Sequence, residues 1–231
     1  MILGIIPARR GSKRIPGKNT KFLGQKRLIE WALDSAVQSK LLDQIVVSSD
    51  DPEVLEAASL RKQCLPLKRP EHLATDTSLA IEFVRHALHY FAVEQKRKFT
   101  AVAILQPTSP FTLPEDIDRG IQLFKSTGAE SVVSVMTVPH AFHPLKAKRM
   151  EKDRLVPFVA EEDGKMAQHE LPEVFVRNCA LYITQTSVIE KGRILGQDCR
   201  GFLMPVERSL DINDPIDWAF AEFLIEQKGR P

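Results

Sequence analysis

The chain has 231 residues, of which 43% are hydrophobic, and its formal net charge is +2. This length fits one α/β domain with a sizeable core, and the near-neutral charge argues against a nucleic-acid-binding surface. The three cysteines, Cys64, Cys179 and Cys199, lack the spacing of a disulfide framework or a zinc site, which favours a reducing compartment. A polar N-terminus and short apolar runs argue against a signal peptide and a membrane span, so we expect a cytoplasmic protein.

The first element is an apolar run at residues 2–6, which predicts a buried parallel strand. It leads into residues 7–19, which carry five cationic side chains, two glycines and two prolines. Glycine lets backbone N–H groups approach a ligand closely, so this loop suits a polyphosphate at the carboxyl edge of a sheet. The alternative interpretation is a solvated basic turn.

Two familiar phosphate-binding motifs do not fit this loop. A P-loop needs four residues between its glycine and its Gly-Lys pair, but five residues separate Gly11 from Gly17. Asn19 stands where a P-loop has the Ser or Thr that binds magnesium. No G-x-G-x-x-G dinucleotide fingerprint follows the strand. We therefore expect phosphate binding by another geometry.

Further along the chain, short apolar runs alternate with amphipathic patterns. Strands are predicted at residues 45–49, 101–105, 131–135 and 180–183, and helices at 28–37, 52–59, 80–91, 114–124 and 215–227. Asp51 before Pro52 has the pattern of a helix N-cap. In the last helix we expect the following residues to face inward: Ile216, Ala219, Phe220, Phe223 and Leu224. The alternation predicts a three-layer α/β fold with a mostly parallel sheet.

Residues 139–176 interrupt this alternation, because they are polar and have no long helical stripe. We interpret them as an insertion or small subdomain within a single domain spanning residues 1–231. Parallel α/β sheets bind ligands beyond the carboxyl ends of their strands. Four polar segments fall there: the first loop, residues 106–110, the insertion with Lys146, and residues 209–214.

Five segments together resemble the motifs of one family. They are residues 7–19, 69–74 (Arg-Pro-Glu-His-Leu-Ala), 105–110 (Leu-Gln-Pro-Thr-Ser-Pro), 131–135 (Ser-Val-Val-Ser-Val) and 211–213 (Asp-Ile-Asn). In this order, and over nearly the whole chain, they resemble the CMP-sialic acid synthetases, or acylneuraminate cytidylyltransferases. The resemblance implies a Rossmann-like nucleotidyltransferase fold and transfer of CMP from CTP to the anomeric hydroxyl of a nonulosonic acid. It also implies release of pyrophosphate, a need for Mg²⁺, and a homodimer formed through the insertion.

The resemblance also assigns the nucleotide site. Arg9 and Lys18 would hold the triphosphate with Ser12 beside them, and catalysis would depend on positioning and electrostatics. The full set of expected nucleotide-binding residues is Ala8, Arg9, Gly11, Ser12, Lys18, Asn19, Arg69 and Ser78. Two of them have a plain alternative: Arg69 as a surface ion pair, and Ser78, or its neighbour Thr77, as the N-cap of the next helix.

Asp211 is the expected metal ligand and, with Arg9 and Lys18, completes the expected catalytic set. Magnesium takes hard oxygen ligands, commonly one or two carboxylates with phosphates and water. The family typically has a second aspartate where this chain has Asn213, whose amide oxygen is a neutral donor. Asp214 before Pro215 is expected to cap the last helix. We expect in-line attack by the sugar hydroxyl, and no protein general base is identifiable.

The expected acceptor-sugar residues are Gln106, Lys146, Gln168 and Tyr182. In the first loop, Arg10 stands where the family usually has glycine. Around the sugar residues, the arginine that usually precedes Gln168 is missing, and Asn178-Cys179-Ala180 replaces the usual Asn-Gly-Ala. These departures leave the sugar open, for example legionaminic or pseudaminic acid.

Two other functions and one other site stay open. The protein is alternatively a related nucleotidyltransferase for a different keto-deoxy sugar acid, or a non-catalytic nucleotide-sugar binding protein. The histidines His140, His143 and His169 have a spacing that would suit a metal site on a helix, but Pro139 and Pro144 favour plain loop histidines.

Overall fold

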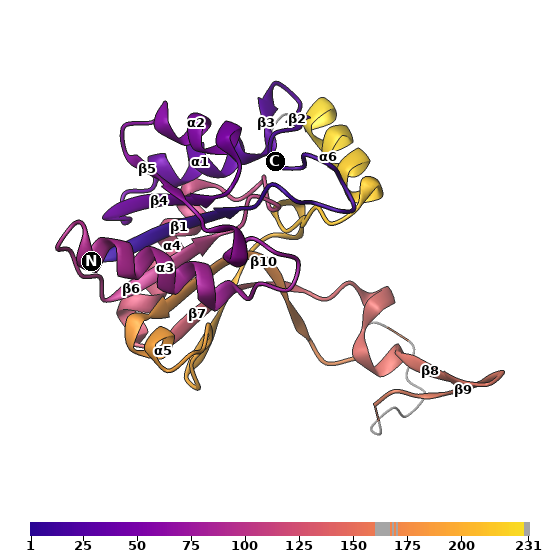
Figure 1. Ribbon diagram of the computed structural model, residues 1–231. Coiled ribbons are helices and arrows are strands. Elements are labelled where there is room, and N and C mark those ends of the chain that lie inside the picture. The colour runs from indigo at the N-terminus through magenta and orange to yellow at the C-terminus, as the bar shows by residue number, and fades with distance from the viewer. Residues whose placement is uncertain (160–166, 168, 170, 229–231) are drawn as a thin grey trace.

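A seven-stranded sheet forms the centre of the computed structural model, which describes residues 1–159, 167, 169 and 171–228 (Figure 1). The strand order is β11-β7-β10-β6-β1-β4-β5, and β10 alone runs antiparallel to its neighbours. The strands are β1 (Ile2–Ala8), β4 (Gln44–Ser49), β5 (Cys64–Lys68), β6 (Ala101–Leu105), β7 (Ser131–Thr137), β10 (Phe175–Gln185) and β11 (Cys199–Leu203). The expected mostly parallel sheet is confirmed.

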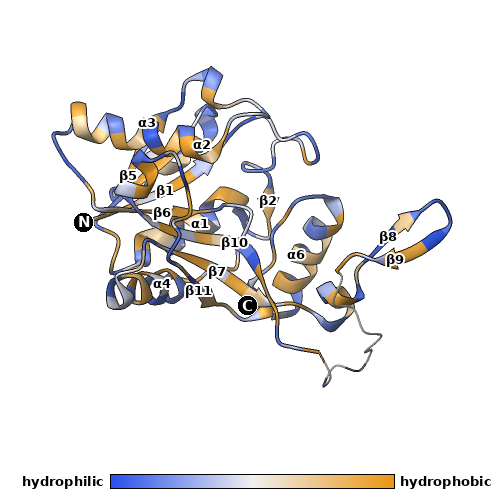
Figure 2. Cartoon of the chain, turned by 90° about the horizontal axis from the view of Figure 1, so that it is seen from below, coloured by the Kyte–Doolittle hydropathy of each residue, from blue (hydrophilic) through white to orange (hydrophobic). Residues whose placement is uncertain are grey.

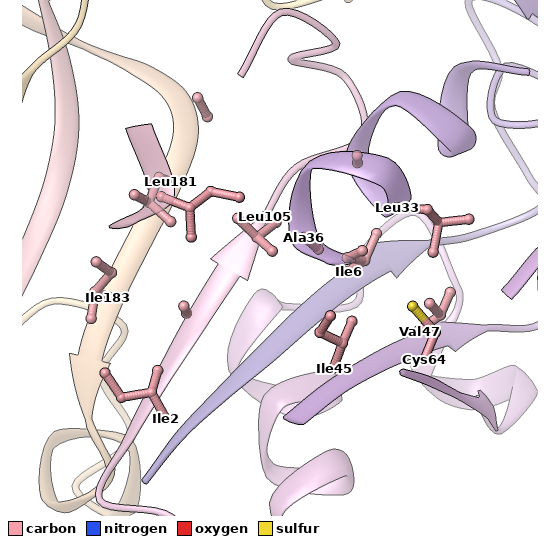
Figure 3. Packing of buried hydrophobic residues seen from close by; sticks show 14 of the residues in the cluster. Ile2, Ile6, Leu33, Ala36, Ile45, Val47, Cys64, Leu105, Leu181 and Ile183 are labelled. Carbon is pink, nitrogen blue, oxygen red and sulfur yellow. The ribbon is translucent and has the colours of Figure 1, made fainter. Parts of the chain in front are cut away.

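Helices cover both faces of the sheet, which confirms the three-layer arrangement. One face carries α1 (Leu28–Gln38), α2 (Pro52–Ser59) and α4 (Pro114–Thr127), and the other carries α3 (Ala80–Val93) and the short α5 (Thr186–Glu190). β1 is buried on both sides, because Ile2 and Ile6 join the first cluster while Leu3 and Ile5 join the second. Figure 3 shows the first cluster, where Leu33 and Ala36 of α1 lie over β1 and β4.

Asp51 caps α2 as predicted, since its side chain accepts a hydrogen bond from the Glu53 amide at 3.0 Å. Two edge strands were not predicted: β5 and β11 lie at the two ends of the sheet. A small hairpin of β2 (Phe22–Leu23) and β3 (Lys26–Arg27), also not predicted, joins the first loop to α1.

The last helix, α6 (Pro215–Lys228), exists as predicted, but of the five residues expected to face inward only Leu224 packs against the core. Ile216 is 80% exposed, and Phe220 and Phe223 are about half exposed. Trp218 and Ala221 are buried instead, in a third apolar cluster. That cluster also holds Ile15, Leu23, Leu28, Trp31, Phe111 and Ile212. Apolar side chains occur on both the exposed and the buried sides of α6, so their spacing in the sequence does not define a single inward face.

The described residues between β7 and β10 form an arm that projects from the body of the molecule (Figure 1). It contains the short 3₁₀ helices η2 (His140–Phe142) and η3 (Pro144–Lys146) and a hairpin of β8 (Lys148–Glu151) and β9 (Arg154–Pro157). The sheet resumes earlier than we expected, since Phe175 and Val176 already pair with β7. In the described part of the chain, no helix combines the length and apolar character needed to cross a bilayer.

Candidate active site

The carboxyl ends of β1, β4, β5 and β6 lie at one edge of the sheet, where residues at the ends of β1, β5 and β6 line a cavity of about 320 Å³. Seven residues that the sequence analysis assigned to the site line this cavity: Arg9, Ser12, Lys18, Asn19, Arg69, Ser78 and Gln106. The other lining residues are Pro7, Leu73, Thr75, Asp76, Ala80, Phe83, Pro107 and Thr108. Side chains separated by about 100 positions in the sequence therefore share one pocket.

The first loop borders this cavity, and hydrogen bonds within the loop hold its backbone. Asn19 is 8% exposed, and its side-chain amide donates to the Arg9 carbonyl at 3.0 Å. Gly17 has φ +63°, a left-handed conformation that favours glycine, and its carbonyl accepts from Thr20 and Lys21. Ala8 is the buried last residue of β1, and Gly11 lies in open space. The loop thus presents Arg9 and Lys18 to the cavity on a fixed backbone.

Lys18 joins the first loop to the segment that carries Asp211. Its Nζ donates to the Ile212 carbonyl at 2.8 Å, and the Ile212 amide donates to the Thr108 carbonyl at 2.8 Å. Burial lowers the pKa of Lys18, the nearby Asp211 carboxylate opposes this shift, and Arg14 and Arg9 add to it. The cationic loop and Asp211 are therefore neighbours, although 193 positions separate Lys18 from Asp211.

Asp76 faces the same cavity and was not predicted. Its two carboxylate oxygens pair with Arg9 Nη1 and Lys13 Nζ, each at 2.5 Å. Hydrogen bonds from Lys13 and Arg9 lower the pKa of Asp76. A carboxylate therefore already pairs with Arg9, one of the two cations that we assigned to the triphosphate, which indicates that this corner of the cavity favours negative charge.

Arg69 is a buried cavity residue, so its interpretation as a surface ion pair is wrong. It is 4% exposed and donates to Ser48, through Nε to Oγ at 3.0 Å and through Nη2 to the carbonyl oxygen at 2.7 Å. Its guanidinium lies 4.8 Å from the centre of the Phe83 ring. Burial lowers the pKa of Arg69 to about 10, which leaves it charged at neutral pH.

Ser78 does not cap α3, and neither does Thr77, so that alternative is also wrong. Leu79 is the N-cap residue, and the Glu82 carboxylate accepts from its amide at 2.8 Å. The Ser78 hydroxyl instead contacts Thr75 Oγ1 at 2.8 Å and donates to the His72 carbonyl at 3.2 Å. These contacts hold the turn that carries Asp76.

Asp211 and Asn213 lie beside the cavity, and their donor set fits a magnesium ion only in part. The Asp211 carboxylate is half-buried and accepts from Asn213 Nδ2 at 2.9 Å, so the amide oxygen must rotate before it can reach the same cation. Among the described residues, no three His, Cys, Asp or Glu side chains gather to hold a metal. An ion here would need phosphate and water as its remaining ligands, which is the usual situation for magnesium.

Asp214 is the predicted cap of α6, since it accepts from the Ile216 and Asp217 amides at 2.8 and 3.1 Å. His140 and His143 do not share a helix, because η2 ends at Phe142. His143 Nε2 lies 3.0 Å from the Pro172 carbonyl, and its Nδ1 accepts from the Leu145 amide at 3.2 Å.

Of the expected sugar residues that the structure describes, Gln106 alone lines the cavity. Gln106 lines the cavity, whereas Lys146 lies in the arm, with its Nζ 2.7 Å from His140 Nε2. Tyr182 belongs to β10 and packs against the α3-side cluster, and burial together with the Cys179 thiol raises the pKa of its hydroxyl. Gln168 lies outside the described residues.

Comparison with known proteins gives one consistent result. The profile of a family described as Cytidylyltransferase matches residues 3–187. A CMP-N,N'-diacetyllegionaminic acid synthase of Legionella pneumophila is 38% identical, with 97% of this chain and 96% of that protein covered. An N-acylneuraminate cytidylyltransferase of Escherichia coli is 28% identical over 99% of this chain, which spans 53% of that longer protein.

Among solved structures, a CMP:2-keto-3-deoxy-manno-octonic acid synthetase complexed with CTP superposes with a TM-score of 0.70. The superposition covers 98% of this chain and 99% of that one at 17% sequence identity. At this identity the likeness establishes the fold, and it confirms the expected nucleotidyltransferase architecture.

Proposed function

Since the chain belongs to the cytidylyltransferase family and is a nucleotidyltransferase, we propose that it transfers CMP from CTP to the anomeric hydroxyl of a nonulosonic acid. Pyrophosphate leaves in this reaction. The relative with 38% identity, over nearly the full length of both chains, acts on N,N'-diacetyllegionaminic acid, and we propose an acceptor of this kind for the present chain.

The observation that carries the proposal is the contact between Lys18 Nζ and the Ile212 carbonyl at 2.8 Å. It puts a half-buried cation next to Asp211 at the rim of a cavity that Arg9 and Ser12 also line. Attack on the α-phosphorus of CTP requires neutralisation of the phosphate oxygens and of the leaving pyrophosphate. This corner of the molecule has the charges for that task.

Each group of cavity residues has a separate role in this proposal. Arg9, Lys18 and Ser12 hold the triphosphate, while the buried Arg69 and the Ser78 turn surround the nucleoside at the other side. We assign Gln106, which directly follows β6 and lines the cavity, to the acceptor sugar. The sugar hydroxyl attacks in line, and positioning rather than a protein base supplies the rate.

Magnesium belongs to the proposal through Asp211, with Asn213 as a neutral second donor after its amide rotates. When bound, the ion would supply positive charge to the triphosphate. The protein's own part is to hold the Asp211 carboxylate close to Lys18, on a segment fixed by Thr108.

We further propose a homodimer in which the arm of one chain reaches the other. Lys146 lies in the arm and away from the cavity of its own chain, yet the family resemblance assigns it to the substrate. The arm also exposes several large apolar side chains: Phe142, Met150, Leu155 and Phe158. A second subunit would cover these side chains and bring Lys146 to a neighbouring cavity.

The test is a panel of acids incubated with CTP and Mg²⁺, read as pyrophosphate release. We expect release with N,N'-diacetyllegionaminic acid that exceeds the rates with an N-acylneuraminic acid and with 2-keto-3-deoxy-manno-octonic acid. Release with the octonic acid alone would support the keto-deoxy alternative and contradict the nonulosonic acid acceptor. No release with any acid, despite CTP binding, would support the non-catalytic alternative.

A further inference from the structure

A buried ion pair lies outside the cavity and beside the segment that carries Asp211. Arg208 donates through Nε and Nη2 to the two carboxylate oxygens of Asp116, at 3.0 and 2.7 Å. The Asp116 side chain is 1% exposed and that of Arg208 is 20% exposed. Asp116 also accepts from the Leu113 amide at 3.0 Å, so it is fixed at the start of α4. Such two-point pairs combine strength with a defined orientation.

A second anchor holds the next residue of the same segment. Asn178, 3% exposed at the bulge of β10, donates through Nδ2 to Ser209 Oγ at 2.8 Å. Ser209 Oγ in turn donates to the Pro205 carbonyl at 2.8 Å. Residues 208 and 209 are therefore attached to α4 and to β10 at once.

Asp211 lies between these anchors and a third one. Directly after it, the Ile212 amide donates to Thr108 and the Ile212 carbonyl accepts from Lys18. The carboxylate is thus carried on a short span of chain fixed at both ends. A displacement of about 1 Å of a catalytic group can cost on the order of 100-fold in rate.

We propose that Arg208, paired with Asp116, is a positioning residue that fixes the Asp211 carboxylate opposite Lys18. The expected loss of kcat rests on the proposed function, whereas the anchoring of residues 208–213 follows from the hydrogen bonds alone. Arg208 acts through the segment 208–213 and is not assigned a contact with substrate. Ser209 and Asn178 form the second half of the same clamp.

The test compares three variants: Arg208→Lys, Ser209→Ala and a control, Arg61→Lys. Arg61 is a matched control, because two of its guanidinium nitrogens pair with Asp34 at 3.0 and 2.8 Å and its side chain is 18% exposed. This pair joins α1 to the end of α2 on another part of the molecule. A lysine keeps the charge but loses the two-point geometry.

The first readout is amide hydrogen exchange of the peptide spanning residues 205–214 in the free protein. We expect faster exchange in Arg208→Lys and Ser209→Ala and unchanged exchange in Arg61→Lys. Unchanged exchange in both clamp variants would overturn the inference. If Arg208→Lys fails to fold, the milder Ser209→Ala variant decides the matter, because it removes a single hydroxyl.

The second readout is steady-state pyrophosphate release. We expect kcat of Arg208→Lys to fall at least about tenfold, with a smaller change in KM for CTP. A loss of kcat no greater than that of Arg61→Lys would overturn the positioning role. If the wild-type protein itself releases no pyrophosphate, the proposed function fails, and the exchange measurement still decides whether the clamp exists.

Discussion

Lys18 is the residue on which the chemistry most depends, and its environment makes it sensitive to pH. Burial disfavours its charged form, so its pKa lies below the ordinary value of 10.5. A bound triphosphate would favour the charged form and raise the same pKa. At pH values between the pKa of Lys18 in the free protein and its pKa in the CTP complex, binding of CTP is accompanied by uptake of a proton. The affinity for CTP must therefore fall as pH rises through this range.

We predict that the dissociation constant of CTP increases with pH in a range that begins below pH 10.5. Replacement of Lys18 by Met removes both the charge and its titration. This variant should bind CTP more weakly at pH 7.5, by at least about tenfold, since a hydrogen bond to a charged group is worth about 1.5–3 kcal/mol. Isothermal titration of CTP across pH measures both effects, and an equally steep rise in Lys18→Met would contradict the assignment.

At the level of single residues, the sequence supported most of the cavity but not all of it. The loop of residues 7–19 could be interpreted from its charges and glycines, and the family resemblance added Arg69, Ser78 and Gln106. Asp76 could not be predicted, because its partner Arg9 lies 67 positions earlier and nothing local signals that contact. Long-range charge pairs of this kind depend on how the strands are ordered, which the sequence does not state.

At the level of elements, a bulge in β10 shows how one backbone position departs from what its residue prefers. Cys179 has φ +64°, and the pairing of β10 with β7 shifts register between Arg177 and Tyr182. A left-handed conformation costs a residue with a Cβ about 1 kcal/mol relative to glycine. The family pattern of Asn-Gly-Ala, from which this chain departs, has a physical reason here.

We therefore predict that Cys179→Gly stabilises the protein by up to about 1 kcal/mol, which raises the melting temperature by roughly 2–4 °C. Cys199→Gly makes the same chemical change in β11, where the backbone is extended, and should lower the melting temperature. Thermal unfolding followed by circular dichroism measures both. Equal shifts in the two variants would show that the left-handed conformation carries no cost.

The elements that the sequence missed share a physical property. β5 and β11 are the edge strands, and edges tolerate residues that interior strands exclude, such as Pro66 in β5 and Arg200 in β11. The interior strands β1, β4 and β6 are buried on both faces and therefore read as apolar runs. The inward face of α6 was predicted wrongly because Phe220 and Phe223 are apolar but exposed, so hydrophobicity alone does not mark the buried side.

At the level of the whole molecule, the arm is the feature that a single chain leaves unexplained. Figure 2 shows apolar residues on the β8–β9 hairpin, away from the helices and the sheet. Met150 and Leu155 of this hairpin pair across it and are 64% and 66% exposed. Exposed apolar side chains grouped on a projecting hairpin are typical of a surface that another subunit covers.

We predict a solution mass of twice the 26.1 kDa of one chain, measured by light scattering at micromolar concentration. Leu155→Glu should shift the mass toward that of the monomer, because it places a charge in the surface that we propose a second subunit covers. Leu60→Glu is the control, since Leu60 is 77% exposed at the end of α2 and far along the sequence from the arm. A monomeric mass for the unchanged protein would contradict the homodimer.

The most direct measurement is a crystal structure of the protein with CTP and Mn²⁺, in which the manganese is located by its anomalous scattering. The prediction is that the triphosphate binds against Arg9 and Lys18, that Asp76 no longer pairs with Arg9, and that the manganese binds the Asp211 carboxylate. A triphosphate bound outside the cavity, or a manganese ion held by phosphate oxygens with Asp211 turned away, would contradict it.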